Sequence, residues 1–421
     1  MLRNVSMLSF YIWTIGCQMN RAESERLGGA LIRQGYLPTA SVDKADLVVL
    51  NTCVVRGHAE DKVINKLANM KALKQKHPFT KIAVTGCFVE DDTTDLRMRF
   101  PFVDYFFSAG VVPDWISHGH SMSTDKPGIC TYVPIIQGCD NFCTYCIVPY
   151  RRGREKSRPL TDVVQEVRGL SAGGTREVIL LGQNVDSYGH DLPGYPNLAT
   201  LLAELANIPE LWRIRFLTNH PKDMSAQLIR AIADLDKVCE SVNLPIQAGD
   251  DDILKAMHRG YTAAQYRALV AALRNGVPDI AVTTDVIVGF PGETEWQFRN
   301  TAELLKELRF EAVHVAAYSP RAGTAAARLP DDVAPEIKKE RLAFIEKQQE
   351  GIACEINATL LGTAVEVLVE GRQKGKWHGR ARNDKLVFFT GGEHLTGRLV
   401  TVEINQAGAW SLKGNIKQVI K

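Results

Sequence analysis

The chain has 421 residues, of which 45% are hydrophobic, and a formal net charge of +2 at pH 7. This length suits two or three globular domains, and no run approaches the roughly 18 consecutive apolar residues of a membrane-spanning helix. The nine cysteines are too sparse for a disulfide scaffold, and the opening segment lacks the cleavage site of a signal peptide. We therefore expect a cytoplasmic protein without membrane association, whose cysteines serve metal or redox chemistry.

The first predicted domain, residues 1–120, repeats one pattern three times: an apolar run ends in a cysteine, and a polar or helical stretch follows. The runs LSFYIWTIGC, DLVVLNTC and KIAVTGC end at Cys17, Cys53 and Cys87. Near-continuous apolar runs that alternate with helical periodicity indicate an α/β unit with a parallel sheet covered on both faces. Since the carboxyl ends of parallel strands share one edge of the sheet, the three cysteines are predicted to converge there.

The second predicted domain, residues 130–354, follows a polar stretch, residues 117–130, that reads as a linker. It contains six strand-like runs separated by helical patterns: YVPIIQG, EVILLGQ, WRIRFLT, SVNLPIQ, AVTTDVIVGF and EAVHVAAYSP. Six βα units are two short of a closed eight-stranded barrel. The expected fold is an open, partial TIM-type barrel with its site at the carboxyl ends of the strands.

The third predicted domain, residues 357–421, has short β-branched runs between Gly and polar turns, which indicate a small antiparallel β-barrel. It carries ten Lys and Arg against five Asp and Glu, so this segment is +5 and the rest of the chain is −3. Basic residues interleaved with an aromatic ring are common on single-stranded RNA surfaces. The predicted RNA-binding residues here are Arg372, Lys374, Lys376, Trp377, Arg380 and Arg382.

The stretch GCDNFCTYCIVPYRRGREKSR places Cys139, Cys143 and Cys146 beside a run of basic side chains. Structural zinc needs four ligands, whereas a cluster held by three thiolates keeps one iron open. A cluster is therefore favoured, and a zinc knuckle completed by a distant ligand is the alternative. The basic residues are predicted to bind the phosphates of a nucleic acid, with a solvated charged loop as the alternative: Arg151, Arg152, Arg154, Lys156 and Arg158.

These motifs resemble those of a known family. The C-x3-C-x2-C spacing, with Tyr145 before the last cysteine, resembles radical S-adenosylmethionine enzymes, and TIGCQMN, NTCVVR and TGC resemble the cysteine motifs of the methylthiotransferases. The blocks VILLGQNVDSYG, LPIQAGDDDILKAMHRGYT, DVIVGFPGET and YSPRAGTAA are similar to the branch that modifies isopentenyladenosine in tRNA, and the C-terminal segment resembles a TRAM domain. The chain departs from the family in GCFVE, in QAGDD and at Arg152, where Thr is frequent.

The resemblance implies an enzyme that adds a methylthio group at carbon 2 of isopentenyladenosine next to the anticodon. Two 4Fe-4S clusters would do the work with two S-adenosylmethionine molecules per turnover. The first, on Cys139, Cys143 and Cys146, would generate a 5′-deoxyadenosyl radical, and the second, on Cys17, Cys53 and Cys87, would carry sulfide or a related sulfur species. No side chain is predicted to be catalytic itself, because the cofactors supply the hard chemistry.

The same resemblance implies partners and cofactor contacts. The partners are the tRNA anticodon stem-loop, a sulfur donor and an electron donor such as flavodoxin or ferredoxin. Gly and Gln at strand ends also serve turns and backbone pairing, so the cofactor contacts rest on the matching blocks alone. The predicted S-adenosylmethionine contacts are Tyr145, Gly182, Gln183, Gln247, Ile287 and Gly289.

Two alternatives remain open at this point. The same chemistry could act on threonylcarbamoyladenosine in tRNA or on an aspartate of a ribosomal protein, although GCQMN and CDNFCTYCIVPY favour the isopentenyl branch. A protein of another class, a non-catalytic iron–sulfur redox sensor that binds RNA, would not need six βα units. Cleavage of S-adenosylmethionine under reducing conditions separates the enzyme from the sensor.

Overall fold

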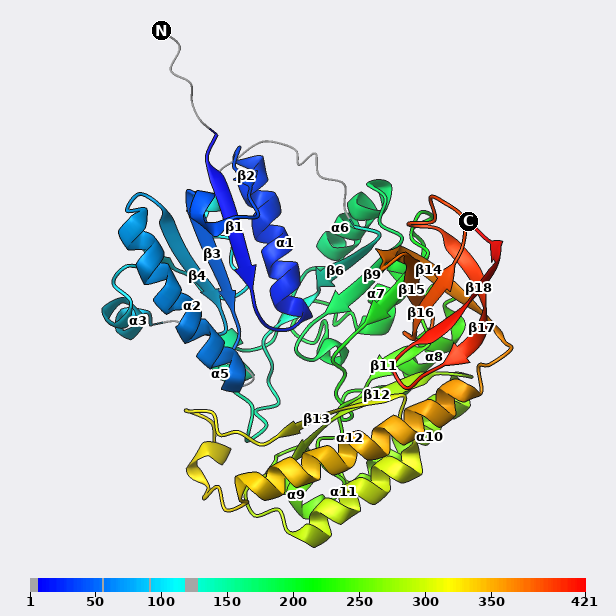
Figure 1. The fold of residues 1–421 in the computed structure, drawn as a ribbon. Helices are drawn as coiled ribbons and strands as arrows, with labels where there is room; N and C mark the ends of the chain where they lie inside the picture. Colours follow the sequence, from blue (N-terminus) through cyan, green and yellow to red (C-terminus); the bar gives the residue numbers. More distant parts are fainter. Residues whose placement is uncertain (1–6, 55–56, 91, 118–127) are drawn as a thin grey trace.

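The computed structural model describes residues 7–54, 57–90, 92–117 and 128–421. The described chain forms an N-terminal α/β region, a central region of βα units and a C-terminal β-barrel (Figure 1). Most of the predicted linker, residues 118–127, lies outside the described ranges. Within those ranges, no helix is both long enough and apolar enough to cross a lipid bilayer.

The N-terminal region is a parallel sheet with strand order β2-β1-β3-β4-β5, and helices lie on both of its faces (Figure 1). Val48 and Leu50 pack toward α2 and α3, whereas Leu47 and Val49 pack toward α1 and α4. This alternation explains why the strands read as continuous apolar runs. The elements are β1 (Ser9–Thr14), α1 (Gln18–Arg33), β2 (Leu37–Pro38), η1 (Val42–Lys44), β3 (Leu47–Thr52), α2 (Gly57–Lys76), β4 (Lys81–Gly86), α3 (Thr94–Arg99), β5 (Tyr105–Phe106) and α4 (Asp114–Ser117).

The central region contains the six predicted barrel strands. They form two parallel sheets, β10-β9-β6 and β11-β12-β13, and an isolated parallel bridge from Ile214 to Val238 links them. The strands are β6 (Cys130–Pro134), β9 (Glu177–Leu181), β10 (Arg213–Phe216), β11 (Ser241–Asn243), β12 (Ala281–Val288) and β13 (Ala312–Ala317). The predicted α/β barrel of six βα units is confirmed, and one continuous apolar core fills it.

Helices and short elements surround this sheet. The cysteine-rich loop lies between β7 (Ile136–Gln137) and β8 (Lys156–Ser157). These two short strands pair antiparallel and so close the base of the loop. The helices are α5 (Val148–Arg152), α6 (Leu160–Ala172), η2 (Val185–Ser187), α7 (Leu198–Ala206), α8 (Ala226–Asp234), α9 (Asp251–Ala256), α10 (Ala263–Gly276), α11 (Glu295–Leu308), η3 (Ala326–Arg328) and α12 (Pro335–Ala358). Helix α12 then leads into the C-terminal region.

The C-terminal region is a closed barrel with strand order β14-β15-β16-β18-β17. The sequence predicted an antiparallel barrel, and the structure differs at one pair, since β16 and β18 run parallel. Lys374 and Gly375 both have positive φ at the tip of the β14–β15 hairpin, as a two-residue type I′ turn requires. The strands are β14 (Ala364–Gln373), β15 (Lys376–Ala381), β16 (Leu386–Thr390), β17 (Leu399–Ala407) and β18 (Leu412–Val419).

Candidate cluster and cofactor site

The first cysteine triplet follows three neighbouring strands of the N-terminal sheet. Cys53 and Cys87 come directly after β3 and β4, and Cys17 lies three residues beyond the end of β1. The strand order reverses between β1 and β3, where ligands of open α/β sheets bind. Asn20 ties the edge together, since its Nδ2 donates to Asn51 Oδ1 (2.9 Å) and to the carbonyl of Thr52 (3.0 Å). The fold therefore brings the three loops to one edge of the sheet.

Close backbone approach holds this edge tight. A side chain at Gly16 would lie 2.8 Å from Cys53 Cβ, and one at Gly86 would lie 2.2 Å from the Thr52 carbonyl. The Cys87 N–H donates to that same carbonyl (2.9 Å). Burial raises the pKa of the Cys87 thiol, so deprotonation there requires positive charge, which bound iron would supply.

The second triplet lies in the loop between β7 and α5. Gly138 opens this loop with φ +82°, and a side chain there would lie 2.1 Å from the Arg154 carbonyl. The Cys139 N–H donates to the Gly153 carbonyl (3.2 Å), and Cys146 N–H to that of Cys143 (2.9 Å). Burial raises the pKa of Cys139, and it raises that of Cys146 to about 12. Because these partly buried thiols resist deprotonation on their own, they suit binding to iron better than existence as free thiolates.

No three His, Cys, Asp or Glu side chains within the described ranges converge as the ligands of one metal ion do. In a 4Fe-4S cluster each thiolate binds a different iron. The thiolates that hold such a cluster are separated by its iron atoms. A cluster site therefore does not require three side chains that converge on a single metal ion.

Arg259 is a residue of this site that the sequence reasoning missed. Its Nη1 donates to Cys143 Sγ (3.2 Å) and to Tyr145 Oη (3.4 Å), and its Nη2 donates to the Pro245 carbonyl (2.9 Å). Only 5% of the residue is exposed. It places a fixed positive charge beside a predicted cluster ligand. In the sequence, only its position in the block ending MHRGYT, which is similar to the family, could have indicated Arg259. The sequence alone does not distinguish a buried Arg from an exposed one.

The residues predicted to contact S-adenosylmethionine lie at or near the carboxyl ends of barrel strands, as expected for this fold. Tyr145 and Ile287 share one packed cluster beside the cysteine loop. Gln183 braces the loop, because its Oε1 accepts from the Gly138 N–H (2.6 Å). Gly182 is tightly packed, since a side chain there would lie 2.4 Å from Ile136 Cγ2.

Two further members of this predicted set have clear backbone roles. Gln247 has φ +75° and pairs through its backbone with β12. The N–H of Gly289 donates to Glu293 Oε2 (2.6 Å), and its φ of +70° excludes most side chains. The structure thus gives these positions turn and pairing functions, and contact with the cofactor stays a prediction.

A buried polar group lies at the carboxyl ends of β9 and β10. Asp186 accepts from Asn219 Nδ2 (2.5 Å) and from the His220 N–H (2.9 Å). Burial raises the pKa of Asp186 to about 7 and lowers that of His220 to about 2, so the imidazole stays neutral. The His220 ring lies 5.8 Å from that of Tyr261, which accepts from Arg259 Nε (2.8 Å). This polar group therefore adjoins the cysteine loop.

Most of the basic residues that follow the second triplet carry acidic partners. Arg154 pairs with Asp140 (2.6 Å) and Arg158 with Glu166 (2.5 Å), while Arg151 pairs with Glu90. Lys156 is exposed, and the Arg154 side chain is 73% exposed. These two remain candidates for phosphate contacts.

Arg152 corrects the prediction that all five basic residues bind phosphate. Its side chain is only 2% exposed and pairs with Glu23 on α1 at 2.6 Å. A buried guanidinium held by a carboxylate is withdrawn from the surface, so it is removed from the phosphate-binding set.

The residues predicted to bind RNA on the C-terminal barrel also fall into an exposed group and a group engaged in other contacts. Arg372, Lys374 and Lys376 are exposed around the tip of the β14–β15 hairpin. Trp377, in contrast, is 7% exposed, packs in the core of the barrel, and donates its Nε1–H to the Gly392 carbonyl (2.8 Å). The prediction that a base stacks on Trp377 is therefore wrong for this structure, because the ring is buried.

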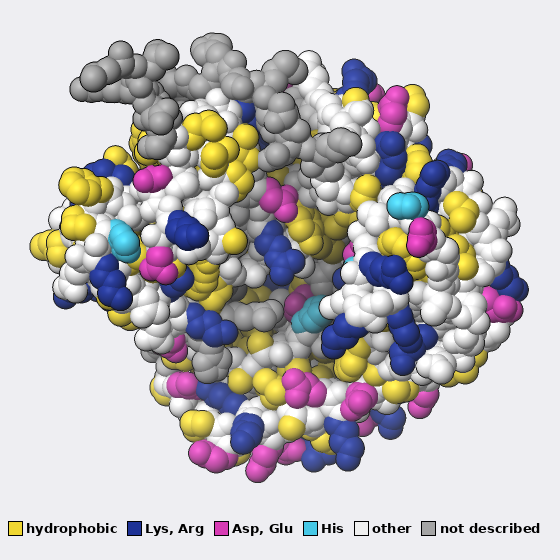
Figure 2. Space-filling model, turned by 45° about the horizontal axis from the view of Figure 1, so that its top comes forward, with side chains coloured by type: hydrophobic (Ala, Val, Ile, Leu, Met, Phe, Trp, Pro, Cys, Tyr) yellow, Lys and Arg dark blue, Asp and Glu magenta, His cyan; other side chains and the backbone are white. Residues whose placement is uncertain are grey.

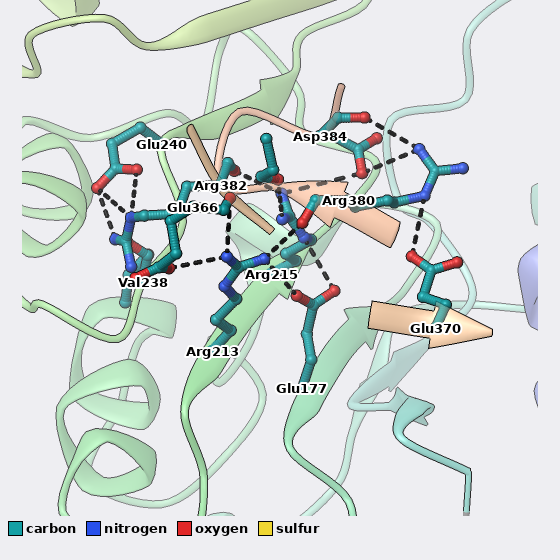
Figure 3. Close-up of polar contacts among 11 residues, drawn as sticks. Glu177, Arg213, Arg215, Val238, Glu240, Glu366, Glu370, Arg380, Arg382 and Asp384 are labelled. Carbon is teal, nitrogen blue, oxygen red and sulfur yellow. Dashed lines mark hydrogen bonds and ion pairs between the residues drawn. The ribbon is translucent and has the colours of Figure 1, made fainter. Parts of the chain in front are cut away.

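Arg380 and Arg382 lie instead in a polar network between this barrel and the central region (Figure 3). Arg382 forms a bidentate pair with Glu240 (2.6 and 2.8 Å), and Arg380 pairs with Asp384 (3.2 Å) and Glu370 (3.6 Å). The Arg382 pair with Glu240 joins the two domains, whereas both acidic partners of Arg380 lie within the barrel itself. Phosphate binding stays a prediction for the three hairpin residues and for Arg380, whose side chain is 39% exposed.

The C-terminal barrel covers the amino ends of two central strands through the same network. Glu177 and Arg213 begin β9 and β10. Arg213 Nη1 donates to the Arg380 carbonyl (2.7 Å), and Arg215 Nη1 donates to the Arg382 carbonyl (2.6 Å). Candidate cofactor residues lie at the opposite, carboxyl ends of these strands.

Figure 2 shows a hollow between the N-terminal region on the left and the C-terminal barrel on the right, with Lys and Arg side chains along its walls.

Comparison with known proteins agrees with these three regions. Residues 133–305 match the Radical SAM superfamily, residues 9–108 match the uncharacterized protein family UPF0004, and residues 358–417 match the TRAM domain. The TsrM methyltransferase of Kitasatospora setae, a radical S-adenosylmethionine enzyme, has a similar fold, with a TM-score of 0.54 and 14% identity over 77% of each chain. The fold and site thus define a radical S-adenosylmethionine protein with a TRAM domain, which implies a 4Fe-4S cluster and that cofactor.

Curated relatives narrow the assignment. A tRNA-2-methylthio-N(6)-dimethylallyladenosine synthase of Dehalococcoides mccartyi is 53% identical over 99% of this chain and all of its own length. Synthases of the same name from Roseiflexus sp. and Chloroflexus aurantiacus are each 46% identical over 96% of this chain and cover 89% and 91% of their own lengths. The chain belongs to the tRNA-2-methylthio-N(6)-dimethylallyladenosine synthase family.

Proposed function

We propose that this protein adds a methylthio group at carbon 2 of isopentenyladenosine in tRNA, using two 4Fe-4S clusters and S-adenosylmethionine. The observation that carries the proposal is the pairing of two cysteine triplets, each at the carboxyl edge of a parallel sheet, through one buried contact. Arg152, six residues beyond Cys146, donates to Cys87 Sγ at 3.2 Å. The relatives' printed name supports the substrate.

The two cysteine triplets would have different roles, each at the carboxyl edge of its own sheet. Cys139, Cys143 and Cys146 would hold the cluster that binds S-adenosylmethionine, with Arg259 beside them. Cys17, Cys53 and Cys87 would hold the cluster that carries sulfur. Replacing an unactivated C–H bond needs chemistry that protein side chains lack, and bound clusters with S-adenosylmethionine supply it. The residues bind, orient and enclose these groups.

The tRNA would contact two basic surfaces. Arg154 and Lys156 flank the cysteine loop, and the exposed hairpin residues Arg372, Lys374 and Lys376 lie on the TRAM domain. The TRAM match and the tRNA named for the relatives support RNA binding. A low-potential one-electron donor, such as flavodoxin or ferredoxin, and a sulfur donor complete the set of partners, and the cytoplasm is the expected compartment.

An anaerobic assay on the reconstituted full-length chain tests the proposal. With isopentenylated tRNA, S-adenosylmethionine, dithionite and sulfide, nucleoside mass spectrometry should detect the methylthio product. The chain should bind about eight irons, and replacing Cys139, Cys143 and Cys146 together by Ala should leave about four. Replacing Cys17, Cys53 and Cys87 instead should abolish methylthiolation and leave cleavage of S-adenosylmethionine detectable.

The assay also separates the rivals. Product formed only on threonylcarbamoylated tRNA would move the substrate to that branch. A chain that binds zinc without iron, or that never cleaves S-adenosylmethionine under reducing conditions, would refute the enzyme. The cluster-free chain, assayed under identical conditions, is the control.

A further inference from the structure

Arg152 connects the two predicted cluster sites. It is the last residue of α5, in the radical S-adenosylmethionine domain, and it reaches into the N-terminal domain. Its Nη1 and Nη2 donate to Glu23 Oε1 (2.6 Å) and Oε2 (3.3 Å), and its Nε donates to Cys87 Sγ (3.2 Å). The two side chains of the ion pair are 2% and 8% exposed. One guanidinium thus bridges a carboxylate and a predicted iron ligand in a buried setting.

The surrounding packing fixes this arrangement. Ile147, at the start of the same segment, packs in the apolar core of the N-terminal domain. Glu23 lies on α1, which packs against β6 and β9 through Met19, Ala22 and Leu181. Both partners of Arg152 are therefore held by packed elements. A planar guanidinium with a bidentate carboxylate partner has one favoured orientation, and here that orientation directs Nε at sulfur.

A donor and a positive charge at a cluster thiolate have a defined electrostatic effect. Reduction adds one electron to the cluster and makes it more negative, so a nearby N–H donor and a cation stabilise the reduced form. Hydrogen bonds to the sulfurs and local charge are among the factors that set cluster potentials. Because Arg stays charged at every accessible pH, this contribution does not vary with pH.

We propose that Arg152, oriented by Glu23, raises the reduction potential of the cluster on Cys17, Cys53 and Cys87. The inference rests on the proposed function, because it requires that this second cluster exists. The electron comes from a low-potential one-electron donor, for which dithionite serves in the test. Arg152 is a positioning residue here, since it acts on the cluster through Cys87.

The test measures the midpoint potential of the second cluster alone. Full-length chain with Cys139, Cys143 and Cys146 replaced by Ala is reconstituted and titrated with dithionite, and reduction is followed by electron paramagnetic resonance. Arg152→Met keeps the length of the side chain and removes its charge and donors. Loss of a charge-assisted hydrogen bond should shift the equilibrium about tenfold or more, which lowers a one-electron potential by about 59 mV.

Two further variants separate charge from geometry and position. Arg152→Lys keeps the charge without the planar fork and should recover part of the shift. Arg154→Met removes a cation two residues away that pairs with Asp140 and is 73% exposed, and it should leave the potential unchanged. Glu23→Gln weakens the orienting pair and should lower the potential by less than Arg152→Met does.

The outcomes distinguish this inference from the function on which it rests. About four irons in the background chain, with equal potentials in Arg152→Met and the background, would overturn the role of Arg152 and leave the two-cluster function intact. No iron in the background chain would overturn the second cluster and this inference with it. If the Arg152→Met variant fails to hold iron, the potential of the Arg152→Lys variant tests the inference instead. A potential for Arg152→Lys equal to that of the background chain would refute orientation-dependent donation from Arg152 to Cys87.

Discussion

Arg215→Ala should loosen the TRAM domain from the central barrel. The Arg215 side chain is 3% exposed and lies at the junction shown in Figure 3. Its Nε donates to Glu177 Oε1 (3.0 Å), and its two terminal nitrogens donate to the carbonyls of Arg382 and Ala381 (both 2.6 Å). The substitution therefore removes an ion pair and two interdomain hydrogen bonds at once.

The expected magnitude follows from burial. Glu177 is 1% exposed, and Arg213 Nη1, 3.8 Å away, is a weaker partner than Arg215. Removing one partner of a buried pair costs about 3–5 kcal/mol, because the remaining charge stays desolvated. By comparison, Arg267→Ala breaks an ion pair whose side chains are 41% and 52% exposed, and such a change costs about 0.2–1 kcal/mol.

Amide hydrogen exchange on the cluster-free chain measures the effect. A cost of about 3–5 kcal/mol corresponds to roughly two to four powers of ten in the opening equilibrium. Arg215→Ala should therefore speed exchange in β15 (Lys376–Ala381) by a large factor and leave the N-terminal sheet unchanged. Exchange in β15 equal to that of Arg267→Ala would refute the reasoning that this network holds the TRAM domain in place.

Three further predictions concern a titrating group, an RNA surface and a buried ring. Burial raises the pKa of Asp186 to about 7, so the stability that it contributes is complete below about pH 4 and is lost as pH rises through about 7. Asp186→Asn should remove this pH-dependent loss of stability, measured as the urea midpoint between about pH 5 and 8. An unchanged slope of urea midpoint against pH would contradict the prediction. Replacing Arg372, Lys374 and Lys376 together by Ala should reduce the slope of log tRNA affinity against log salt by about two to three, if each neutralises a phosphate; Arg267→Ala is the control. Trp377→Ala should destabilise the chain by about 3–5 kcal/mol as a loss from a core, seen in urea unfolding, and normal stability with weakened tRNA binding would reinstate the stacking role.

The sequence by itself determined the three regions and the place of the cysteines. Long apolar runs that alternate with helical periods can satisfy burial on both faces only as parallel βα units, and the cysteines directly follow such runs. The carboxyl edge is then fixed by chain direction, which is why Cys17, Cys53 and Cys87 lie at one edge. These inferences depend on local patterns within about ten residues.

The tertiary structure decided which charged and aromatic side chains are available for function. Arg152 and Arg154 are two residues apart, yet one is buried against Glu23, 129 positions earlier, while the other is exposed. Likewise, Trp377 belongs to a core and Arg382 to a domain contact with Glu240, 142 positions away. Whether a guanidinium binds phosphate, a carboxylate or a thiolate depends on what packs against it, and contacts over such separations are set by the fold and not by local sequence.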